Sequence, residues 1–247
     1  MRIAVLSDIH ANMTALQRVL EEIDALQPDA LWCLGDTVGY GPHPQACVDV
    51  IRRRADVCLA GNHDLAVTGQ IDLDHFNPIA REAALWHQKH LDAESLQWLA
   101  SLPSKTVVAG ITLAHGSPRH PVWEYVGDAN TAAENYHAFE TPLCLIGHSH
   151  QAIAWQMTMK NAHVHVEWVM ETPGVVLTLS LNDKWLLNPG SVGQPRDHDS
   201  RASFAVLDTE VWQWTWRRVE YNITAVERDI IAAGLPEMLG RRLYLGW

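Results

Sequence analysis

Five short polar motifs, each at the end of an apolar run, constrain the fold of this chain more than any other feature. They are Asp8-Ile9-His10, Gly35-Asp36, Gly61-Asn62-His63-Asp64, His115-Gly116 and Gly147-His148-Ser149-His150. The preceding runs are short and aliphatic, which is typical of buried β-strands. Ligands of open α/β sheets bind at the carboxyl ends of parallel strands, so we expect these motifs to meet at one edge of a sheet.

Strand-like and helix-like segments alternate in the first third of the chain. We expect strands at Arg2–Ser7, Leu31–Leu34 and Val57–Leu59, with helices at Asn12–Leu26 and from about Pro44 to Arg54. This βαβαβ order predicts a mainly parallel sheet that is covered by helices.

The rest of the chain changes from helical to strand-rich. The middle predicts helices from Asn77-Pro78 to about His90, from Asp92 to before Pro103 and over Thr131–Phe139, and strands at Lys105–Ala109, Ile111–His115 and Leu143–Ile146. The C-terminal part predicts strands at Ala152–Met157, Val164–Met170, Val175–Leu179, Lys184–Leu187, Ser203–Leu207 and Val211–Arg218, then a helix at Thr224–Ala233. Because no segment has the length or composition of a linker, we expect one domain over residues 1–247.

The charge and the hydropathy pattern limit the partners of the protein. A formal net charge of −11 repels nucleic acid polymers, and the short arginine runs are expected to be solvated surface, so we expect no nucleic acid polymer as a partner. No apolar run approaches the ~18 residues of a membrane span and no secretory leader pattern is found, so we expect no membrane partner and a cytoplasmic location. The oligomeric state is left open.

The candidate metal donors are seven residues of these motifs: Asp8, His10, Asp36, Asn62, His115, His148 and His150. Asp8 and His10 are two residues apart, as are His148 and His150, so the side chains of each pair point the same way if the backbone is extended. Carboxylates, imidazoles and an amide without any thiolate suit Mn²⁺, Fe or Zn²⁺. Two such cations at about 3.5–4 Å need a bridging anionic ligand and lower the pKa of a bound water, which is hydrolytic chemistry.

The motif set DxH, GD, GNHD, H and GHxH resembles that of the calcineurin-like metallophosphoesterase superfamily, and it extends from Asp8 to His150. Downstream, Asn188–Arg196 resembles the closing segment of the small bacterial and archaeal phosphodiesterase branch of that superfamily. The resemblance implies an α/β fold, a four-layer α/β/β/α sandwich of two mixed sheets, with the metal site at the carboxyl ends of the strands. It also implies that the C-terminal strands form the second, largely antiparallel sheet.

The resemblance also implies a role for each motif residue. Asp8, His10 and His150 would hold the first metal, Asn62, His115 and His148 the second, and Asp36 would bridge them. His63 would contact the phosphate and protonate the leaving alkoxide, and Asp64 would orient His63. The reaction would be attack on phosphorus by a metal-bridging hydroxide, with two divalent ions, Mn, Fe or Zn, of which Mn is favoured for activity.

Several residues keep two interpretations. Asn12 either only caps the first helix or also touches a substrate phosphate, and Arg196 either contacts the phosphate or lies on the surface. Tyr40 either lines the substrate cleft or packs in the interior. His87 is expected to have a surface or packing role. The alternating Trp212, Trp214 and Trp216 are expected on one buried strand face, with an oligomer interface as the alternative.

These features predict a binuclear metal-dependent phosphoesterase, and the resemblance to the small branch implies a phosphodiesterase that acts on small phosphorylated substrates, namely small or nucleotide-like diesters. A phosphomonoesterase and a dinucleoside-polyphosphate hydrolase are the alternatives within the enzyme class. A non-catalytic binding scaffold on the same fold is the alternative of another class, and it predicts missing donors, whereas all seven are present.

Overall fold

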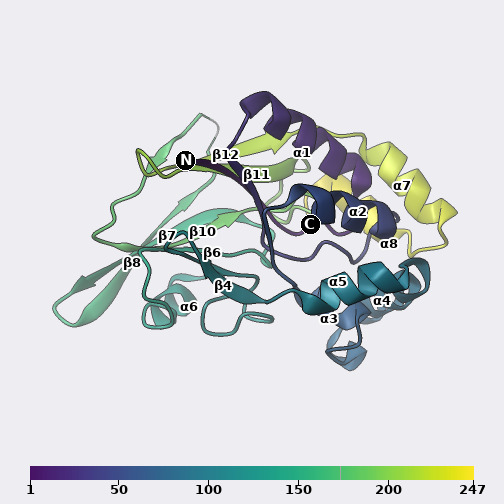
Figure 1. The fold of residues 1–247 in the computed structure, drawn as a ribbon, viewed down its shortest axis with the longest axis horizontal. Helices are drawn as coiled ribbons and strands as arrows, with labels where there is room; N and C mark the ends of the chain where they lie inside the picture. The colour runs from purple at the N-terminus through teal and green to yellow at the C-terminus, as the bar shows by residue number, and fades with distance from the viewer. Residues whose placement is uncertain (173) are drawn as a thin grey trace.

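The computed structural model describes residues 1–172 and 174–247, and its centre is a pair of six-stranded mixed sheets (Figure 1). The first sheet has the order β3 (Val57–Cys58), β2 (Ala30–Cys33), β1 (Arg2–Leu6), β11 (Ala202–Asp208), β12 (Gln213–Val219) and β9 (Leu177–Thr178). Strands β1, β2 and β3 are parallel, as the βαβαβ pattern predicts, and β11, β12 and β9 extend the sheet in antiparallel fashion.

The second sheet combines the middle of the chain with C-terminal strands. Its order is β4 (Lys105–Val108), β5 (Ile111–Ala114), β6 (Leu143–Leu145), β10 (Lys184–Pro189), β7 (Ala152–Lys160) and β8 (His163–Met170). Strands β5, β6 and β10 are parallel to one another, and the remaining pairs are antiparallel. The expectation that the C-terminal strands form the second sheet holds for β7, β8 and β10, whereas β9, β11 and β12 belong to the first sheet.

Three hydrophobic clusters create the four layers. The largest lies between the sheets and joins residues of β1, β5, β6, β10, β11 and β12. Trp214 and Trp216 belong to it, at 0% and 6% exposure, as their alternation predicts. The outer face of the first sheet packs on α1 (Met13–Leu26) and α2 (Pro44–Arg54), and the outer face of the second packs on α6 (Ala129–Glu134) and Phe139. The predicted α/β/β/α sandwich of two mixed sheets is thus confirmed.

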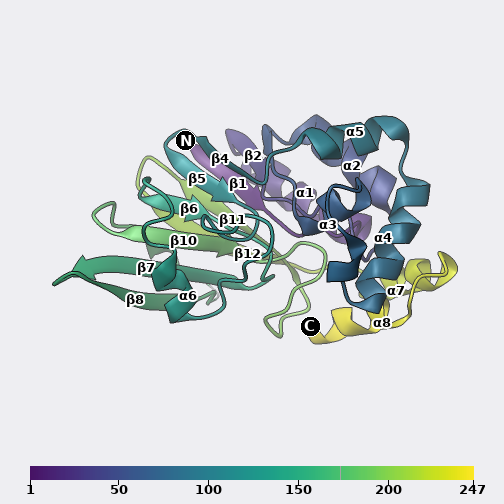
Figure 2. The same cartoon turned by 90° about the horizontal axis from the view of Figure 1, so that it is seen from below.

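The remaining helices gather at the end of the sheets where the parallel strands finish (Figure 2). They are α3 (Asn62–Val67), α4 (Pro78–His90), α5 (Ala93–Ser101), α7 (Ile223–Ala232), α8 (Met238–Arg241) and the short 3₁₀ segments η1 (Leu73–His75) and η2 (Arg242–Leu245). Asn77 and Asp92 cap α4 and α5, as the sequence predicts. Helix α3 was missed because its first residues belong to a polar motif that has no helical periodicity, and the helix predicted at Thr131–Phe139 begins and ends earlier.

No helix within the described ranges is both long and apolar enough to span a bilayer. One domain over residues 1–247 stays a prediction.

Candidate metal centre

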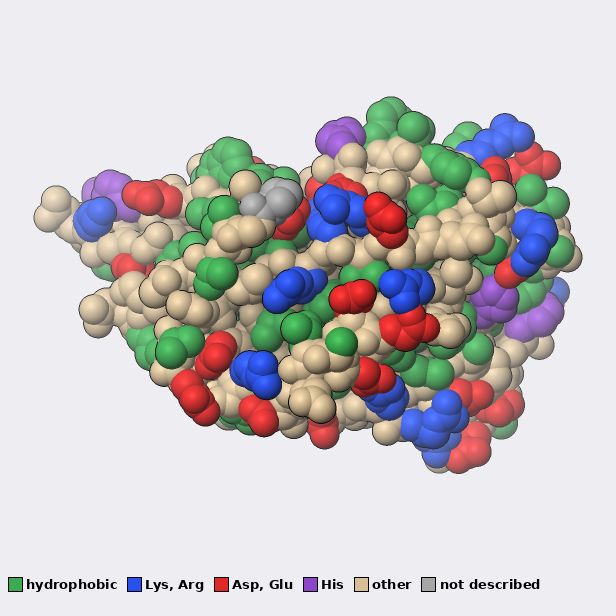
Figure 3. Space-filling model, turned by 90° about the horizontal axis from the view of Figure 1, so that it is seen from above, with side chains coloured by type: hydrophobic (Ala, Val, Ile, Leu, Met, Phe, Trp, Pro, Cys, Tyr) green, Lys and Arg blue, Asp and Glu red, His purple; other side chains and the backbone are tan. Residues whose placement is uncertain are grey.

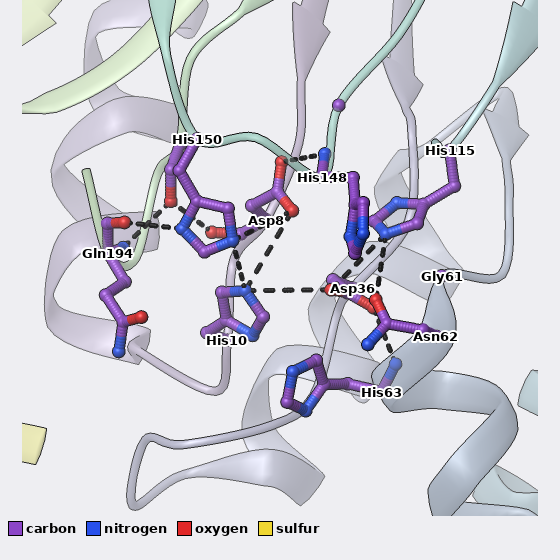
Figure 4. A network of polar contacts seen from close by, with 12 residues as sticks. Asp8, His10, Asp36, Gly61, Asn62, His63, His115, His148, His150 and Gln194 are labelled. Atoms are coloured by element: carbon purple, nitrogen blue, oxygen red, sulfur yellow. Dashed lines mark hydrogen bonds and ion pairs between the residues drawn. The ribbon is translucent and has the colours of Figure 1, made fainter. Parts of the chain in front are cut away.

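The polar motifs follow strands of both sheets and meet in one buried site (Figure 4). Strands β1, β2 and β3 lead into the Asp8, Asp36 and Asn62 motifs, and β5 and β6 lead into the His115 and His148 motifs. None of the seven candidate donors is more than 4% exposed. The structure therefore brings together every residue that the sequence proposed as a metal donor.

The backbone at most of these donors is not extended. Five of them have positive φ, a region that residues other than glycine seldom occupy: Asp8 at 54°, His10 at 50°, Asp36 at 52°, His148 at 62° and His150 at 59°. The extended backbone that would align the paired donors is therefore not found: Asp8 and His10 still offer donor atoms to one group, whereas His148 and His150 belong to two different groups. Such conformations cost about 1 kcal/mol or more each and persist where surrounding contacts hold them.

Neighbouring segments supply those contacts. The Asp8 N–H donates to the Gly35 carbonyl and the His10 N–H to the Asp36 carbonyl, each at 3.0 Å. From the C-terminal part, the Ser191 hydroxyl donates to the Asp8 carbonyl at 2.8 Å. The strained turn after β1 is therefore held by hydrogen bonds from two separate segments.

Gly61 is required by the close approach of the bridging candidate. A Cβ at this position would lie 2.1 Å from Asp36 Oδ1 and 2.6 Å from His115 Cε1. Only a residue without a side chain leaves both donors where they are.

The donors form two adjoining clusters that share one carboxylate. Asp8, His10, Asp36 and His150 offer donor atoms within 4.8 Å of one another, and Asp36, His115 and His148 do the same. The amide oxygen of Asn62 lies 3.3 Å from His115 Nε2 and so joins the second cluster. Asp36 is the common member, in the position that a bridging ligand needs.

The spacing of the donor atoms fits one cation in each cluster. His10 Nε2 lies 3.0 Å from His150 Nε2, and His150 Nε2 lies 3.3 Å from Asp8 Oδ1. His115 Nε2 lies 3.4 Å from Asp36 Oδ2. Donors that share an ion at about 2.1 Å, at octahedral or tetrahedral angles, lie about 3.0–3.4 Å apart.

The other ring nitrogen of three histidines sets the tautomer. Nδ1 of His10 lies 3.1 Å from the Val38 carbonyl, and Nδ1 of His150 lies 2.6 Å from the Gln194 carbonyl. Nδ1 of His115 lies 2.9 Å from the Leu34 carbonyl. A carbonyl only accepts, so Nδ1 of each ring carries a proton, and Nε2 presents a lone pair to the site when the ring is neutral.

The electrostatics of the site fit bound cations. Burial lowers the pKa values of His10 and His150 well below the usual value, so two neutral rings face each other with lone pairs 3.0 Å apart. Three donor atoms are buried with no hydrogen-bond partner among the described residues: Asp8 Oδ1, Asp36 Oδ2 and His148 Nε2. Buried polar atoms without partners are rare, and atoms of this kind grouped around two points fit a pair of divalent ions.

Asp36 and His115 are coupled electrostatically. Burial by itself would lower the pKa of His115, but the Asp36 carboxylate raises it to about 9. In the same way, burial would raise the pKa of Asp36, whereas His115 and His63 hold it far below its usual range. Asp8 lacks such strong compensation, and burial raises its pKa to about 7.

His63 lies beside the clusters as predicted, but Asp64 does not orient it. The backbone N–H of His63 donates to Asp36 Oδ1 at 2.9 Å, and its ring lies edge-on to His10 with centroids 4.9 Å apart. The Asp64 carboxylate instead accepts from the backbone N–H groups of Thr37, Val38 and Gly61. It therefore ties the Asp36 loop to the start of α3, because both of its oxygens are used by the main chain.

Asn12 and Arg196, the two predicted substrate contacts, differ in whether their side chains are free to reach a substrate. Asn12 is 2% exposed, and its side chain accepts from the Ala15 N–H and donates to the Gly193 carbonyl, so the structure assigns it to helix capping and loop anchoring in place of substrate binding. Arg196 lines a pocket of about 100 Å³ above the clusters. Its Nε is buried without a hydrogen-bond partner in the described part of the chain.

The sequence predicted a surface or packing role for His87, and the structure shows it buried, where it holds the loop beside His10 and His63. His87 is fully buried, its Nδ1 accepts from the Gly39 N–H at 3.0 Å, and its Nε2 donates to the Gly41 carbonyl at 2.8 Å. Burial lowers its pKa to about 3, which keeps Nδ1 free to accept. A signal existed, since His87 falls on the buried face of α4 at helical spacing from Ala80, Ala83 and Ala84.

Asn188 and three of the aromatic side chains around the pocket, Phe76, Trp123 and Tyr125, were missed as site residues. Asn188 donates to the Gly147 carbonyl at 2.8 Å and to the Ser149 hydroxyl at 3.0 Å, so it anchors the turn that carries His148 and His150.

Aromatic side chains line the pocket, and we call Tyr40, Phe76, Trp123 and Tyr125 the aromatic rim. Tyr40 thus both packs in the interior and lines the cleft, whereas Trp123 and Tyr125 come from an irregular loop that gave no periodic signal.

The class of protein follows from the buried two-cluster donor site together with the similarity of the chain to known proteins. Residues 1–211 match the calcineurin-like phosphoesterase superfamily domain. The chain belongs to this superfamily and is a metallophosphoesterase, a hydrolase, so the scaffold alternative is set aside.

Three relatives cover essentially the whole chain. The uncharacterized protein MJ0912 of Methanocaldococcus jannaschii is 38% identical over 99% of this chain and 98% of its own length. The crystal structure of a metallophosphoesterase from Sphaerobacter thermophilus is 44% identical, with a TM-score of 0.85, over 100% of this chain and 99% of that one. The hypothetical protein PH1004 of Pyrococcus horikoshii, 21% identical, shares the fold with a TM-score of 0.80 over 100% of this chain and 98% of that one.

Proposed function

We propose that this metallophosphoesterase is a phosphodiesterase that hydrolyses small, nucleotide-like diesters. The observation that supports it most is the Asp36 carboxylate, whose unpartnered Oδ2 lies 3.7 Å from His10 Nε2 and 3.4 Å from His115 Nε2. Asp8, His10 and His150 would hold one divalent ion, and Asn62, His115 and His148 the other. Such a pair activates water and neutralises charge on a phosphoryl group. Manganese loading and a cytoplasmic location belong to the same proposal.

The side chains around the clusters would bind the diester and protonate its leaving oxygen. Arg196 would donate to a phosphoryl oxygen, since among the described residues its Nη2 is hydrogen-bonded only to the neutral Gln194 side chain, at 3.0 Å. His63 would give a proton to the leaving alkoxide through Nε2, because Nδ1 faces Gly39, where a Cβ would lie 2.6 Å away. The P–O bond to the leaving group then breaks as water adds to phosphorus.

A small diester fits the charge around the pocket better than a polymer does. Arg196 and Arg242 both lie near the Tyr40 ring, with guanidinium carbons 5.9 and 6.0 Å from its centroid, so positive charge is local to the site. On the face drawn in Figure 3, acidic and basic side chains are interspersed, and the net charge of the chain is −11. This distribution favours one small anion over a long nucleic acid.

Loading the protein with Mn²⁺ and assaying a substrate panel tests the proposal. We expect bis(p-nitrophenyl) phosphate and nucleotide diesters to turn over faster than p-nitrophenyl phosphate and dinucleoside polyphosphates. Faster hydrolysis of the monoester would contradict the proposal and favour a phosphomonoesterase. Faster cleavage of dinucleoside polyphosphates would contradict it and favour a dinucleoside-polyphosphate hydrolase.

The role of His63 has its own test. His63→Asn should lower kcat by about 10²–10⁴-fold while the metal content stays near two ions per chain. Loss of both ions in this variant would show that His63 holds the metal site together and would refute its role as an acid.

A further inference from the structure

Two exposed aromatic side chains stand at the mouth of the pocket above the metal clusters. Trp123 is 39% exposed and Tyr125 is 52% exposed, and both line the pocket together with Asp36, Asn62 and His148. Large aromatic surfaces usually become buried, so a pair that stays exposed beside a buried polar site indicates a surface that a ligand covers.

The rings form a continuous path from the clusters to solvent. Tyr125 stacks on His148, with centroids 4.0 Å apart and an interplanar angle of 24°. On the other side, Phe76 lies edge-on to His63 at 5.0 Å, and Trp123 lies edge-on to Phe76 at 5.4 Å. The outermost ring of this path is therefore two ring contacts from the proposed acid His63.

The loop that carries both rings is held from its opposite side. Between them, Glu124 accepts hydrogen bonds from Ser117 at 2.6 Å and from Asn135 at 2.8 Å, and it pairs with Arg119. These bonds fix Glu124 in place, so the loop is anchored between the two residues whose rings line the pocket. The position of the rings is thus built into the loop.

We propose that Trp123 and Tyr125 form a stacking subsite for the nucleobase of a nucleotide-type substrate whose phosphoryl group lies at the metal clusters. This inference rests on the proposed phosphodiesterase function and names its substrate class. A planar base offers a π face to Trp123, whereas a sugar or an aliphatic alcohol on the same phosphate does not. Stacking accepts any base, so the subsite selects for a nucleoside substituent without selecting one base.

Binding of two monophosphates to the Mn²⁺-loaded protein tests the subsite. AMP and ribose 5-phosphate share the phosphate and the sugar and differ in the base, and calorimetry gives the Kd of each without any turnover. We expect wild type to bind AMP more tightly than ribose 5-phosphate. Trp123→Ala should weaken AMP binding by about 5- to 100-fold and leave ribose 5-phosphate unchanged.

Matched variants separate stacking from damage to the fold. Trp123→Tyr keeps an aromatic face and should retain most of the preference for AMP. Trp168→Ala removes a tryptophan that is 59% exposed on β8 and does not line the pocket, and it should change neither Kd. If Trp123→Ala weakens the binding of AMP and of ribose 5-phosphate equally, or does not weaken the binding of AMP, the proposed subsite is wrong.

The outcomes also separate this inference from the proposed function. Suppose that wild type hydrolyses no diester, but that Trp123→Ala weakens the binding of AMP and not that of ribose 5-phosphate. The proposed function is then wrong and the subsite stands. If diesters are hydrolysed and the AMP preference does not depend on Trp123, the function stands and the subsite is wrong.

Discussion

The floor and the rim of the pocket are built in opposite ways. We call the seven candidate donors the floor. Its residues are at most 4% exposed, and three of its four imidazoles are held by hydrogen bonds that they donate to main-chain carbonyls. The outer rim residues Trp123 and Tyr125 are 39% and 52% exposed and are held by ring contacts and one anchored loop. The floor therefore has little freedom to vary, whereas Trp123, whose ring contacts are with His75 and Phe76, can change without disturbing the donors. On the proposed function and the proposed subsite, the floor would determine the reaction and the rim would select the substrate.

The largest expected effect comes from breaking the floor at Gly61. Gly61→Ala places a methyl group 2.1 Å from Asp36 Oδ1, so Asp36 and His115 must move and the shared carboxylate is lost. A misplacement of about 1 Å at a reacting centre costs about 10²-fold, so we expect kcat/KM to fall by about 10²-fold or more. Metal analysis should show fewer than two ions per chain.

Gly127→Ala is the control for this change, because a Cβ there has no described atom within 4 Å. It should keep both the metal content and the activity. Full metal content and normal activity in Gly61→Ala would show that the floor tolerates movement. The claim that the floor has less freedom to vary than the rim would then be wrong.

A smaller effect is expected at His87, which connects floor and rim through Gly39, Tyr40 and Gly41. His87→Leu leaves the Gly39 N–H and the Gly41 carbonyl buried without partners, at about 1–3 kcal/mol each. We expect kcat to fall by about tenfold, because the loop that borders His10 and His63 loosens, while the metal content stays near two.

His87→Gln can both accept from Gly39 and donate to Gly41, and it should restore most of kcat. His90→Leu, on the same helix but exposed, is the matched control. If Gln and Leu at position 87 lowered kcat equally, the positioning role of His87 would be wrong.

The smallest effect is a pH dependence that belongs to the rim alone. Burial by itself would raise the pKa of Glu124, but hydrogen bonds from Arg119, Ser117 and Asn135 lower it to about 2 from its usual 4.5. The ionised carboxylate thus stabilises the loop fully above pH 4.5, and this contribution is lost as the pH falls from 4.5 toward about 2. Glu124→Gln should lower Tm at pH 7 by about 2–4 °C, equivalent to about 1 kcal/mol.

The difference in Tm between wild type and Glu124→Gln should shrink as the pH falls below 4.5. Glu134→Gln removes an exposed partner of Arg119 and should change Tm by less than Glu124→Gln does. A difference between wild type and Glu124→Gln that is constant from pH 7 to low pH would show that the carboxylate charge does not anchor the rim.

The sequence predicted the floor well because its residues are grouped in short motifs directly after strands. Strand ends of a parallel sheet share one edge, so the motifs of β1, β2 and β3 had to lie together once those strands were recognised. The reasoning failed where geometry depends on the surroundings. Extended backbone was expected between Asp8 and His10, but both residues have positive φ, and Asp64 was expected at His63 but caps main-chain N–H groups instead.

The rim could not be predicted, because no local pattern marks it. Trp123 and Tyr125 lie in an irregular loop where neither strand nor helix periodicity says which way a side chain points. Their place opposite Phe76 follows from the packing of segments that are far apart in the chain. The division of the C-terminal strands between two sheets had the same cause, since pairing of β11 with β1 joins the two ends of the chain.

The sequence by itself determined the chemical class of the site, because donor identity and strand-end position are local properties that can be recognised in short motifs. Only the tertiary structure decided how the donors face one another and what surrounds them. His10 Nε2 meets His150 Nε2 across 140 residues of sequence, at 3.0 Å. Such contacts depend on how the sheets stack and on the strained turns that stacking maintains, and no pattern of nearby residues specifies either.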